Sequence, residues 1–393
     1  MSDNESHDVA EAAAATTAPI VPVPAGIPED ALVVVTGASG FIAAHIVEQL
    51  LTTTKYRVRG TVRDPNNEQK TAHLRALDPS GNRLELVKGN LLDEGVWDSV
   101  VDGATYVLHT ASPYTLEVRD PVKDLVEPAL HGTRYVLNAC AGHLDTVRCV
   151  VVTSSVAALT DTGIKGHVFT EKDWNNFSNL KRNPYYYSKM LAEKEAWKYV
   201  EQKKLGDSCK LVTVSPFLVL GPSHTKSVGP SNAVVEGMLT GQYPVIADLD
   251  WGCVDVRDVA AAHLLVMQHP DAEGRHVCAA DHIHCRDMAT LLIKEFAGDH
   301  PRSPYKIPTT ALDGAVGTGI MKLASYFQPG QVGQYLRTNL AKPIRFDNSK
   351  LKSYGFQFRP MNQTIIDTAL DLMRWGHVPY PVAGPHAKAK ADK

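Results

Sequence analysis

The sequence predicts an α/β protein of the Rossmann type, a doubly wound parallel sheet followed by a smaller C-terminal substrate-binding lobe. From residue 31 onwards, strand-length apolar runs alternate with helix-length amphipathic stretches. A glycine-containing turn joins the first apolar run to the first helical stretch. Beyond Gly221 this rhythm breaks down, and proline, glycine and serine become more frequent. The change in pattern indicates a second, smaller lobe.

The individual elements follow from the same alternation. Strands are predicted at residues 32–36, 56–62, 84–88, 105–109, 147–153 and 211–215, with a last sheet strand near 276–279. Helices are predicted at 41–51, 69–77, 96–101, 121–143 and 186–202, and at 232–239 and 286–296 in the second half. Pro121 suits the first turn of a helix, where its missing N–H is not needed. Because strand–helix–strand crossovers are right-handed, the sheet is expected to be parallel.

Four segments are expected along the chain. Residues 1–30 contain an alanine run, several prolines and acidic residues but no lysine or arginine. This composition is typical of a disordered tail and not of a secretory signal or a mitochondrial presequence. Residues 31–220 are predicted to form the dinucleotide-binding domain, with sheet contributions from about 250–280. Residues 221–378 form the substrate-side lobe, and 379–393 form a C-terminal tail.

Composition excludes several classes of partner. The formal net charge is -3, so no overall field attracts nucleic acid or an anionic membrane. The strongly apolar stretches are strand-sized and too short to span a bilayer. The six cysteines are scattered without a CxxC pair, which favours a reducing, cytoplasmic location. His282 and His284 lie near Cys285, but no fourth ligand follows in sequence, and we expect no metal site.

The sharpest local motif is the turn after the first strand. Gly37, Gly40 and Ala43 have GxxGxxA spacing within VTGASGFIA, residues 35–43. The first glycine permits a tight turn, the second lets the backbone approach a diphosphate, and the alanine allows close helix–strand packing. A diphosphate would then sit on free N–H groups at the start of the helix. The motif therefore predicts a bound dinucleotide.

The end of the second strand indicates which dinucleotide is bound. Arg63 follows the strand, and an arginine at this position suits the 2′-phosphate of NADP(H) through charge-assisted hydrogen bonds. Lys70 on the next helix is a candidate helper. Asp64 is a complication, because its carboxylate could turn towards the ribose as in NAD-binding proteins. We expect NADP(H).

A tyrosine and a lysine provide the candidate catalytic pair. Tyr185 and Lys189 are four residues apart and share a helix face. A nearby ammonium favours the phenolate and lowers the tyrosine pKa, which makes proton transfer to a carbonyl oxygen practical. A hydroxyl is also needed to hold that oxygen, and Ser155 at the end of the fifth strand is the first choice, with Ser154 as the alternative.

At this point the chain resembles the dihydroflavonol reductase, cinnamoyl-CoA reductase and fungal aldehyde (methylglyoxal) reductase branch of the extended short-chain dehydrogenases/reductases. The resemblance runs from about Leu32 to Trp375. It rests on the following segments: VTGASGFIAAHIVEQLL (35–51), VRGTVRDP (58–65), HTASP (109–113), VTSS (152–155), YYYSK (185–189), SPFLVLGP (215–222), VDVRDVAAAH (254–263) and RFDNSKLKSYGFQFRP (345–360).

The resemblance implies a set of site residues. It implies Ser155, Tyr185 and Lys189 as the catalytic group, with Tyr185 and Lys189 also contacting the cofactor. The implied cofactor contacts are Gly37, Ala38, Ser39, Gly40, Phe41, Ile42, Arg63, Asn90, Leu91, Thr110, Ala111, Ser112, Pro216 and Phe217. Asn90 replaces the usual aspartate beside the adenine, which puts the detail of adenine binding in question. Pro113 and Tyr114 are expected to line the substrate pocket.

The predicted function is NADPH-dependent reduction of a ketone or aldehyde carbonyl in a small organic molecule, by a cytoplasmic monomer or homodimer. One alternative is an NAD-dependent hydroxysteroid dehydrogenase or nucleotide-sugar epimerase, which uses the same glycine loop and tyrosine–lysine pair. Arg63 speaks against it. A second alternative is a non-catalytic NADPH-binding sensor. The presence of both Tyr185 and Lys189 speaks against that alternative.

Overall fold

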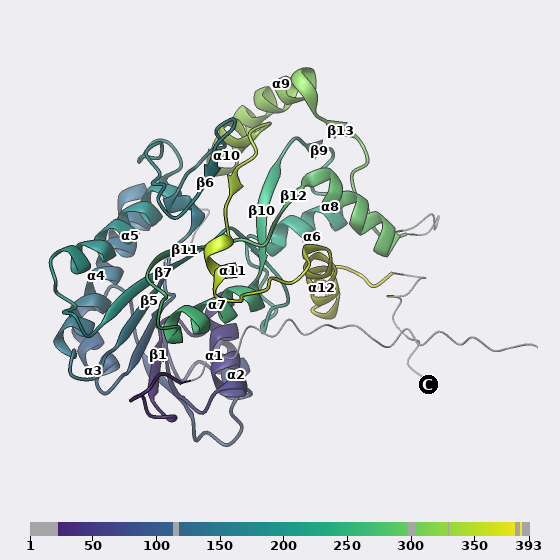
Figure 1. Cartoon of the computed structure of the whole chain (residues 1–393). Coiled ribbons are helices and arrows are strands. Elements are labelled where there is room, and N and C mark those ends of the chain that lie inside the picture. Colours follow the sequence, from purple (N-terminus) through teal and green to yellow (C-terminus); the bar gives the residue numbers. More distant parts are fainter. Residues whose placement is uncertain (1–22, 113–117, 298–302, 329, 382–385, 387–393) are drawn as a thin grey trace, which may run out of the picture.

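The chain is built around one central parallel sheet. A computed structural model describes residues 23–112, 118–297, 303–328, 330–381 and 386. Its seven-stranded sheet has the order β11-β7-β5-β4-β1-β2-β3 (Figure 1). The strands are β1 (Leu32–Val35), β2 (Arg57–Val62), β3 (Leu84–Lys88), β4 (Tyr106–His109), β5 (Cys149–Thr153), β7 (Lys210–Pro216) and β11 (Gly274–Cys278). All neighbouring pairs are parallel, which confirms the predicted Rossmann-type sheet.

Helices cover both faces of this sheet. One face carries α1 (Phe41–Thr53), α2 (Glu68–Arg75) and α7 (Val256–Gln268). The other carries α3 (Trp97–Val101), α4 (Glu127–Gly142) and α5 (Pro184–Glu201). Strand β1 shows why both faces are buried: Val33 and Val35 pack into the first layer, and Leu32 and Val34 into the second. Chain order reverses on either side of β1, and ligands bind in the crevice at such a switch point.

One predicted helix is interrupted. The expected helix at 121–143 divides into a π-helical turn, η2 (Val122–Val126), and helix α4. Pro128 lies in the first turn of α4 and has no N–H for the helical ladder. The wider turn before it lets the chain continue without that donor. A similar π-helical turn, η4 (Ile293–Ala297), follows α8 (Cys285–Leu292) within the helix predicted at 286–296.

The second half of the chain forms a smaller lobe with its own core. A three-stranded sheet joins β8 (Leu218–Leu220), β10 (Asp250–Asp255) and β12 (Asp281–His284). Helices α6 (Asn232–Thr240), α8 and α12 (Met361–Arg374) pack on it. Peripheral elements are β6 (Val168–Phe169), β9 (Ile246–Ala247), β13 (Ala311–Leu312), α9 (Gly314–Ala324), α10 (Gly330–Asn339), β14 (Arg345–Phe346) and α11 (Ser349–Ser353).

Helices α7 and α12, of 13 and 14 residues, are the longest elements that the sequence pattern did not reveal, and α7 shows a physical reason. Every residue of α7 except Arg257 is buried. Because α7 lies under the sheet beside α1 and also contacts β8 and β10 of the second lobe, it has no solvent-exposed face. A helix that is buried on every side shows no contrast between a core-facing stripe and a solvent-facing stripe.

The chain ends differ in part from the predicted tails. Residues 23–30 were assigned to the N-terminal tail, but Val23 and Ile27 pack against the core. At the other end, the Tyr305 hydroxyl donates to the Pro379 carbonyl over 2.8 Å. The rest of the N-terminal tail, residues 1–22, lies outside the described residues, as do 382–385 and 387–393 of the C-terminal tail. None of the helices in the described ranges has the length and apolar character needed to cross a bilayer.

Candidate active site

The glycine loop between β1 and α1 is folded tightly at the carboxyl edge of the sheet. Gly37 has φ +66°, and a Cβ there would lie 3.0 Å from the Ala111 Cβ. Both the left-handed backbone and the close approach therefore require glycine. The Gly37 N–H donates to Thr61 Oγ1 over 3.0 Å, and the Ala38 N–H donates to the Thr61 carbonyl over 2.9 Å. These bonds hold the loop against β2.

The first turn of α1 is left open for an anion. Gly40 is the N-cap, and no side chain caps the helix. No acidic residue lies in the first turn. The first N–H groups of a helix have no partner within the helix, and the helix dipole makes this end positive. The loop therefore has a form that fits a diphosphate, and the residues predicted to contact it, Gly37 to Ile42, lie in this loop and the start of α1.

The end of β4 is bonded to the glycine loop through Thr36. Its Oγ1 accepts the N–H groups of Thr110 and Ala111, over 3.1 and 3.0 Å. The His109 Nδ1 lies 3.0 Å from the same oxygen. Burial, together with the charge of Lys189, lowers the pKa of His109 to about 3, so the ring is neutral at physiological pH. This neutral, buried network fixes the strand end on which Thr110, Ala111 and Ser112 lie.

The charged side chain of Arg63 lies at the end of β2. Arg63 is exposed and makes no hydrogen bond or ion pair within the described residues. Asp64, which sequence reasoning left as a rival group, accepts the N–H of Asn66 over 3.0 Å in its own turn. Lys70 is exposed in the first turn of α2. Arg59, in contrast, is held by Glu85.

The remaining predicted cofactor contacts lie on two other strand ends. Asn90 follows β3 and is exposed, and its Oδ1 accepts the Leu92 N–H over 3.2 Å. Leu91 packs against α4, where a Cβ on Gly132 would lie 2.8 Å from it. Pro216 ends β7, and the Phe217 ring lies 6.2 Å from the ring of Phe346. Pro113 and Tyr114 lie outside the described residues.

Tyr185 and Lys189 lie one turn apart near the start of α5. Tyr185 is half-buried, and the Lys189 Nζ lies 5.9 Å from the centroid of its ring. Lys189 is buried, and this burial lowers the pKa of its ammonium to about 8. Desolvation acts in this direction because it penalises the charged form of an amine.

The two serines after β5 have different surroundings. The Ser154 hydroxyl is buried and donates to Glu193 Oε2 over 2.5 Å. Ser155 is half-buried, and its Oγ accepts the Ala157 N–H over 3.1 Å. The proton of the Ser155 hydroxyl is therefore available to another acceptor. This difference favours Ser155 over Ser154 as the hydroxyl that meets a substrate.

A buried ion pair between Glu193 and Arg275 lies next to the candidate site. The Glu193 carboxylate accepts from Arg275 over 2.6 Å and from Thr213 over 3.0 Å, in addition to Ser154. Glu193 lies one turn beyond Lys189 on the same helix. Sequence reasoning missed this group because Arg275 comes from β11, far along the chain. The sequence offered one signal for Glu193, a glutamate four residues after Lys189 and therefore on the same helix face.

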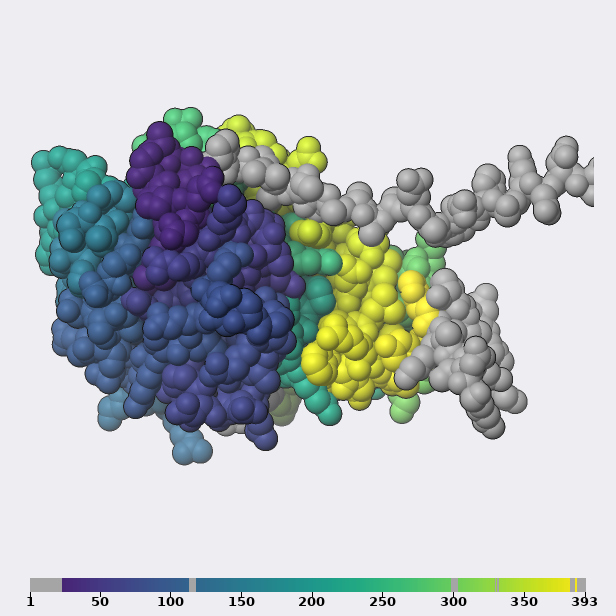
Figure 2. Space-filling view, turned by 90° about the horizontal axis from the view of Figure 1, so that it is seen from below, coloured from purple at the N-terminus to yellow at the C-terminus, as the bar shows by residue number. Residues whose placement is uncertain are grey.

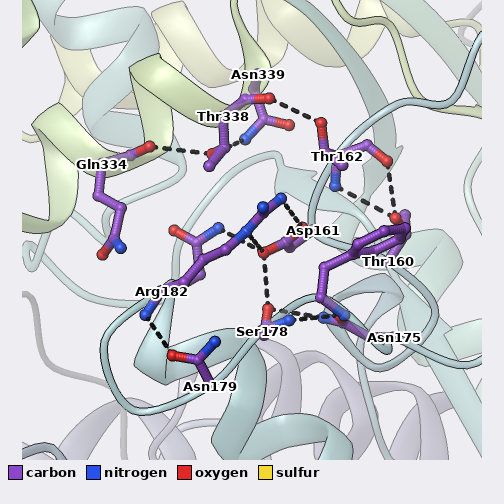
Figure 3. A network of polar contacts seen from close by, with 12 residues as sticks. Thr160, Asp161, Thr162, Asn175, Ser178, Asn179, Arg182, Gln334, Thr338 and Asn339 are labelled. Atoms are coloured by element: carbon purple, nitrogen blue, oxygen red, sulfur yellow. Dashed lines mark hydrogen bonds and ion pairs between the residues drawn. The ribbon is translucent and has the colours of Figure 1, made fainter.

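A second polar network holds the start of α5, and Figure 3 shows it from close by. Asp161 is fully buried and accepts two hydrogen bonds from Arg182, over 2.9 and 2.8 Å. Ser178 and Asn183 donate to the same carboxylate, each over 2.9 Å. Asn183 has φ +50° and is the N-cap of α5, two residues before Tyr185. The carboxylate therefore fixes an otherwise unfavourable backbone at the turn that places the tyrosine.

The same network reaches Ser155 and the second lobe. Asn175 donates to the Ala157 carbonyl over 2.7 Å, in the turn that follows Ser155. Thr162 donates to the Thr338 carbonyl of α10 over 2.7 Å (Figure 3). The turn after Ser155, the start of α5 and a helix of the second lobe are thus connected by hydrogen bonds around one carboxylate.

A cavity lies where these groups meet. Its enclosed space is only about 10 Å³, which is room for roughly one water molecule. Its lining includes residues from the ends of β4 and β5 and from α5: His109, Ala111, Ser112, Thr133, Val152, Thr153, Ser154, Lys189, Ala192 and Glu193. The hollow therefore brings together Lys189 and the strand-end residues Ala111, Ser112 and Ser154, whereas Ser155 and Tyr185 do not line it. It lies at the carboxyl edge of the sheet, where such folds bind ligands.

Comparison with known proteins gives consistent matches. The model of the NAD dependent epimerase/dehydratase family matches residues 33–280. Cinnamoyl-CoA reductase 1 of Petunia hybrida is 36% identical over 354 residues, which cover 89% of this chain and 94% of that protein. The bifunctional dihydroflavonol 4-reductase/flavanone 4-reductase of Malus domestica is 30% identical over 377 residues, covering 93% and 97%.

A solved structure agrees with these matches. Yeast methylglyoxal/isovaleraldehyde reductase Gre2, complexed with NADPH, superposes with a TM-score of 0.71 at 29% sequence identity. The match covers 88% of this chain and 98% of the yeast chain. These matches extend over most of the chain and are not confined to the glycine loop. The chain is therefore similar to the reductase branch that the motifs predicted.

Proposed function

The chain belongs to the NAD dependent epimerase/dehydratase family, and from this we propose that it is an NADPH-dependent reductase of a ketone or aldehyde carbonyl in a small organic molecule. The observation that carries the proposal is the buried Lys189 ammonium one turn from Tyr185, beside an open glycine loop. The relatives that are named as reductases support the reaction type.

We propose that the cofactor lies across the carboxyl edge of the sheet. The open start of α1 would hold the diphosphate, and Arg63 with Lys70 would hold the 2′-phosphate. Other contacts would come from Asn90 and Leu91 at the adenine, from Thr110, Ala111 and Ser112 beside the glycine loop, from Tyr185 and Lys189, and from Pro216 and Phe217 near the nicotinamide.

The proposed chemistry needs only three side chains of this protein. NADPH, when bound, supplies a hydride to the carbonyl carbon. The Tyr185 hydroxyl donates its proton to the carbonyl oxygen, so that the C=O π bond is replaced by one C–H and one O–H bond. Lys189 stabilises the phenolate that remains on Tyr185. Ser155 donates a hydrogen bond to the same oxygen as negative charge develops on it.

The position of Asp64 favours NADPH over NAD. An acidic side chain at the end of β2 would have to reach the ribose hydroxyls in an NAD-dependent epimerase or dehydrogenase. The Asp64 carboxylate instead accepts the Asn66 N–H in its own turn. At this strand end Arg63 is left as a charged group that has no hydrogen bond or ion pair with the residues that the structure describes.

The two lobes are proposed to have different functions. We infer that residues 31–220, with strand β11, bind the cofactor and that residues 221–378 form the substrate side. This assignment is supported by the separate hydrophobic core of the second lobe. A cytoplasmic location and a monomeric or homodimeric state complete the proposal.

The test is NADPH oxidation, followed at its absorbance band, with a panel of aldehydes, α-dicarbonyls, aryl ketones, dihydroflavonols and aromatic acyl-CoA thioesters. NADH is run in parallel on every substrate. We expect turnover with NADPH in at least one class and much weaker turnover with NADH. No oxidation on the whole panel, although NADPH binds, would contradict the reductase proposal and favour a non-catalytic sensor.

A further inference from the structure

A cluster of three potential metal ligands lies away from the catalytic residues. It consists of His45 and Glu48 on α1 and His224 in the segment after β8, and we call it the His–Glu–His cluster. The Glu48 Oε2 lies 3.3 Å from the His45 Nδ1 and 3.2 Å from the His224 Nε2. The three ligand atoms all lie within 4.8 Å of one another. The sequence provided no indication of this cluster, because His224 is far along the chain from His45 and Glu48.

The two imidazole nitrogens that face Glu48 are not hydrogen-bonded to it. The His45 Nδ1 and the His224 Nε2 are both buried and have no hydrogen-bond partner in the described parts of the chain, although each lies close to the carboxylate oxygen. The His45 Nε2 lies 2.9 Å from the Pro222 carbonyl, which can only accept. The Nε2 therefore carries the proton, and a neutral ring keeps its lone pair on Nδ1. Metal-binding histidines are commonly fixed by such an outer hydrogen bond.

The distances also suit a tetrahedral ion. Zinc–nitrogen and zinc–oxygen bonds of about 2.0–2.1 Å place neighbouring ligands of a tetrahedron roughly 3.3 Å apart. The separations of 3.3 and 3.2 Å at Glu48 agree with that edge length.

We propose that His45 Nδ1, Glu48 Oε2 and His224 Nε2 bind one divalent transition-metal ion of the Zn²⁺ type. The Glu48 side chain is 36% exposed, which leaves access for a water molecule as the fourth ligand. Two imidazoles and one carboxylate are ligands that suit Zn²⁺ better than Ca²⁺ or Mg²⁺, which prefer oxygen ligands only.

The position of the cluster indicates a structural role. His45 lies one turn after Phe41 on the helix that begins at the phosphate loop, and the two rings are 6.0 Å apart. The segment that carries His224 is tied to α12, because Ser223 N–H donates to Asp371 over 2.8 Å. The ion would therefore join the dinucleotide-binding helix to the second lobe. Figure 2 shows the C-terminal segment, in yellow, beside the purple and blue surface of the first lobe.

The proposal is tested on the full chain without a histidine tag, stripped with a chelator and titrated with ZnCl₂ against a chromophoric competitor. We expect one ion per chain. Co²⁺ should give visible absorption bands of a tetrahedral site with nitrogen ligands. Glu48→Gln and His224→Ala should each weaken Zn²⁺ binding by more than about tenfold, since loss of an outer partner alone costs 10–100-fold.

His143→Ala is the matched control, because His143 forms a comparable histidine–carboxylate contact with Asp98 over 3.0 Å outside the cluster. It should bind Zn²⁺ as the unmodified protein does, and NADPH binding should be retained in all variants as a check of folding. Zn²⁺ should raise Tm in the unmodified protein and not in Glu48→Gln. Absence of one-to-one binding, or binding and stabilisation that survive both cluster variants, would overturn the proposal and leave an ordinary histidine–glutamate ion pair.

Discussion

The Nζ of Lys189 lies 5.9 Å from the centroid of the Tyr185 ring, one turn away on α5. Lys189 is buried and makes no hydrogen bond or ion pair with any part of the chain that the structure describes. Burial of an ammonium without a neighbouring carboxylate costs free energy. Such a group suits a site where a ligand supplies the missing partners. The relationship between these two residues leads to the first prediction.

The alkaline side of the pH profile should report Lys189. Its pKa is lowered to about 8, so the ammonium is present below that pH and lost as the pH rises through it. We expect kcat/KM for NADPH, which reports the free protein, to fall above about pH 8. In Lys189→Met the residual rate should be low and flat over the same window. A profile of the unmodified protein that stays level to pH 10 would contradict this assignment.

Arg63→Ala should weaken NADPH binding without affecting NADH. Charge-assisted hydrogen bonds contribute about 1.5–3 kcal/mol, so the Kd for NADPH should rise roughly 10–100-fold. Arg57→Ala is the control, since Arg57 is exposed at the opposite end of the same strand. Both constants can be measured by fluorescence titration. Equal weakening of NADPH and NADH would show that Arg63 does not read the 2′-phosphate.

Asp161→Asn should slow the reaction while leaving cofactor binding nearly unchanged. Asp161 positions the start of α5 through Arg182 and Asn183 and does not touch the proposed substrate. A small displacement of Tyr185 should lower kcat by about tenfold or more. Ser178→Ala, which removes one neutral donor to the same carboxylate, should have a smaller effect. A change confined to KM for NADPH would argue against this positioning role.

Glu193→Ala should destabilise the protein strongly. The substitution leaves Arg275 buried without its partner, and breaking a buried ion pair in this way costs about 3–5 kcal/mol. Denaturant unfolding measures the loss. Lys55→Ala, which removes an exposed ion pair with Glu29, should leave the unfolding midpoint almost unchanged. Similar small shifts in both variants would mean that Glu193 does not support the core of the site.

Local patterns were sufficient to predict the sheet and the glycine loop. The strands read as apolar runs because both of their faces are buried, and Gly37 and Gly40 stand at spacings that a turn onto a helix requires. Helix α7 was missed for the opposite reason, because it is buried on every side and shows no solvent-facing stripe.

Side chains that meet across the fold were beyond the reach of local patterns. Asp161 and Arg182 are brought together by a loop, and Glu193 and Arg275 by the pairing of β11 at the sheet edge. His224 reaches Glu48 only because the chain returns to α1 after β8. Such contacts depend on tertiary packing, and no spacing in the sequence encodes them.

The most direct test of the account compares Tyr185→Phe with the unmodified protein on the best carbonyl substrate of the panel. Removal of the proton donor should lower kcat by about 10²–10⁴-fold. The Kd for NADPH should change little, because the phenyl ring keeps the packing of the tyrosine, and Tyr186→Phe should retain most of the activity. A Tyr185→Phe variant that reduces the substrate at nearly the unmodified rate would contradict the central claim that this tyrosine is the proton donor.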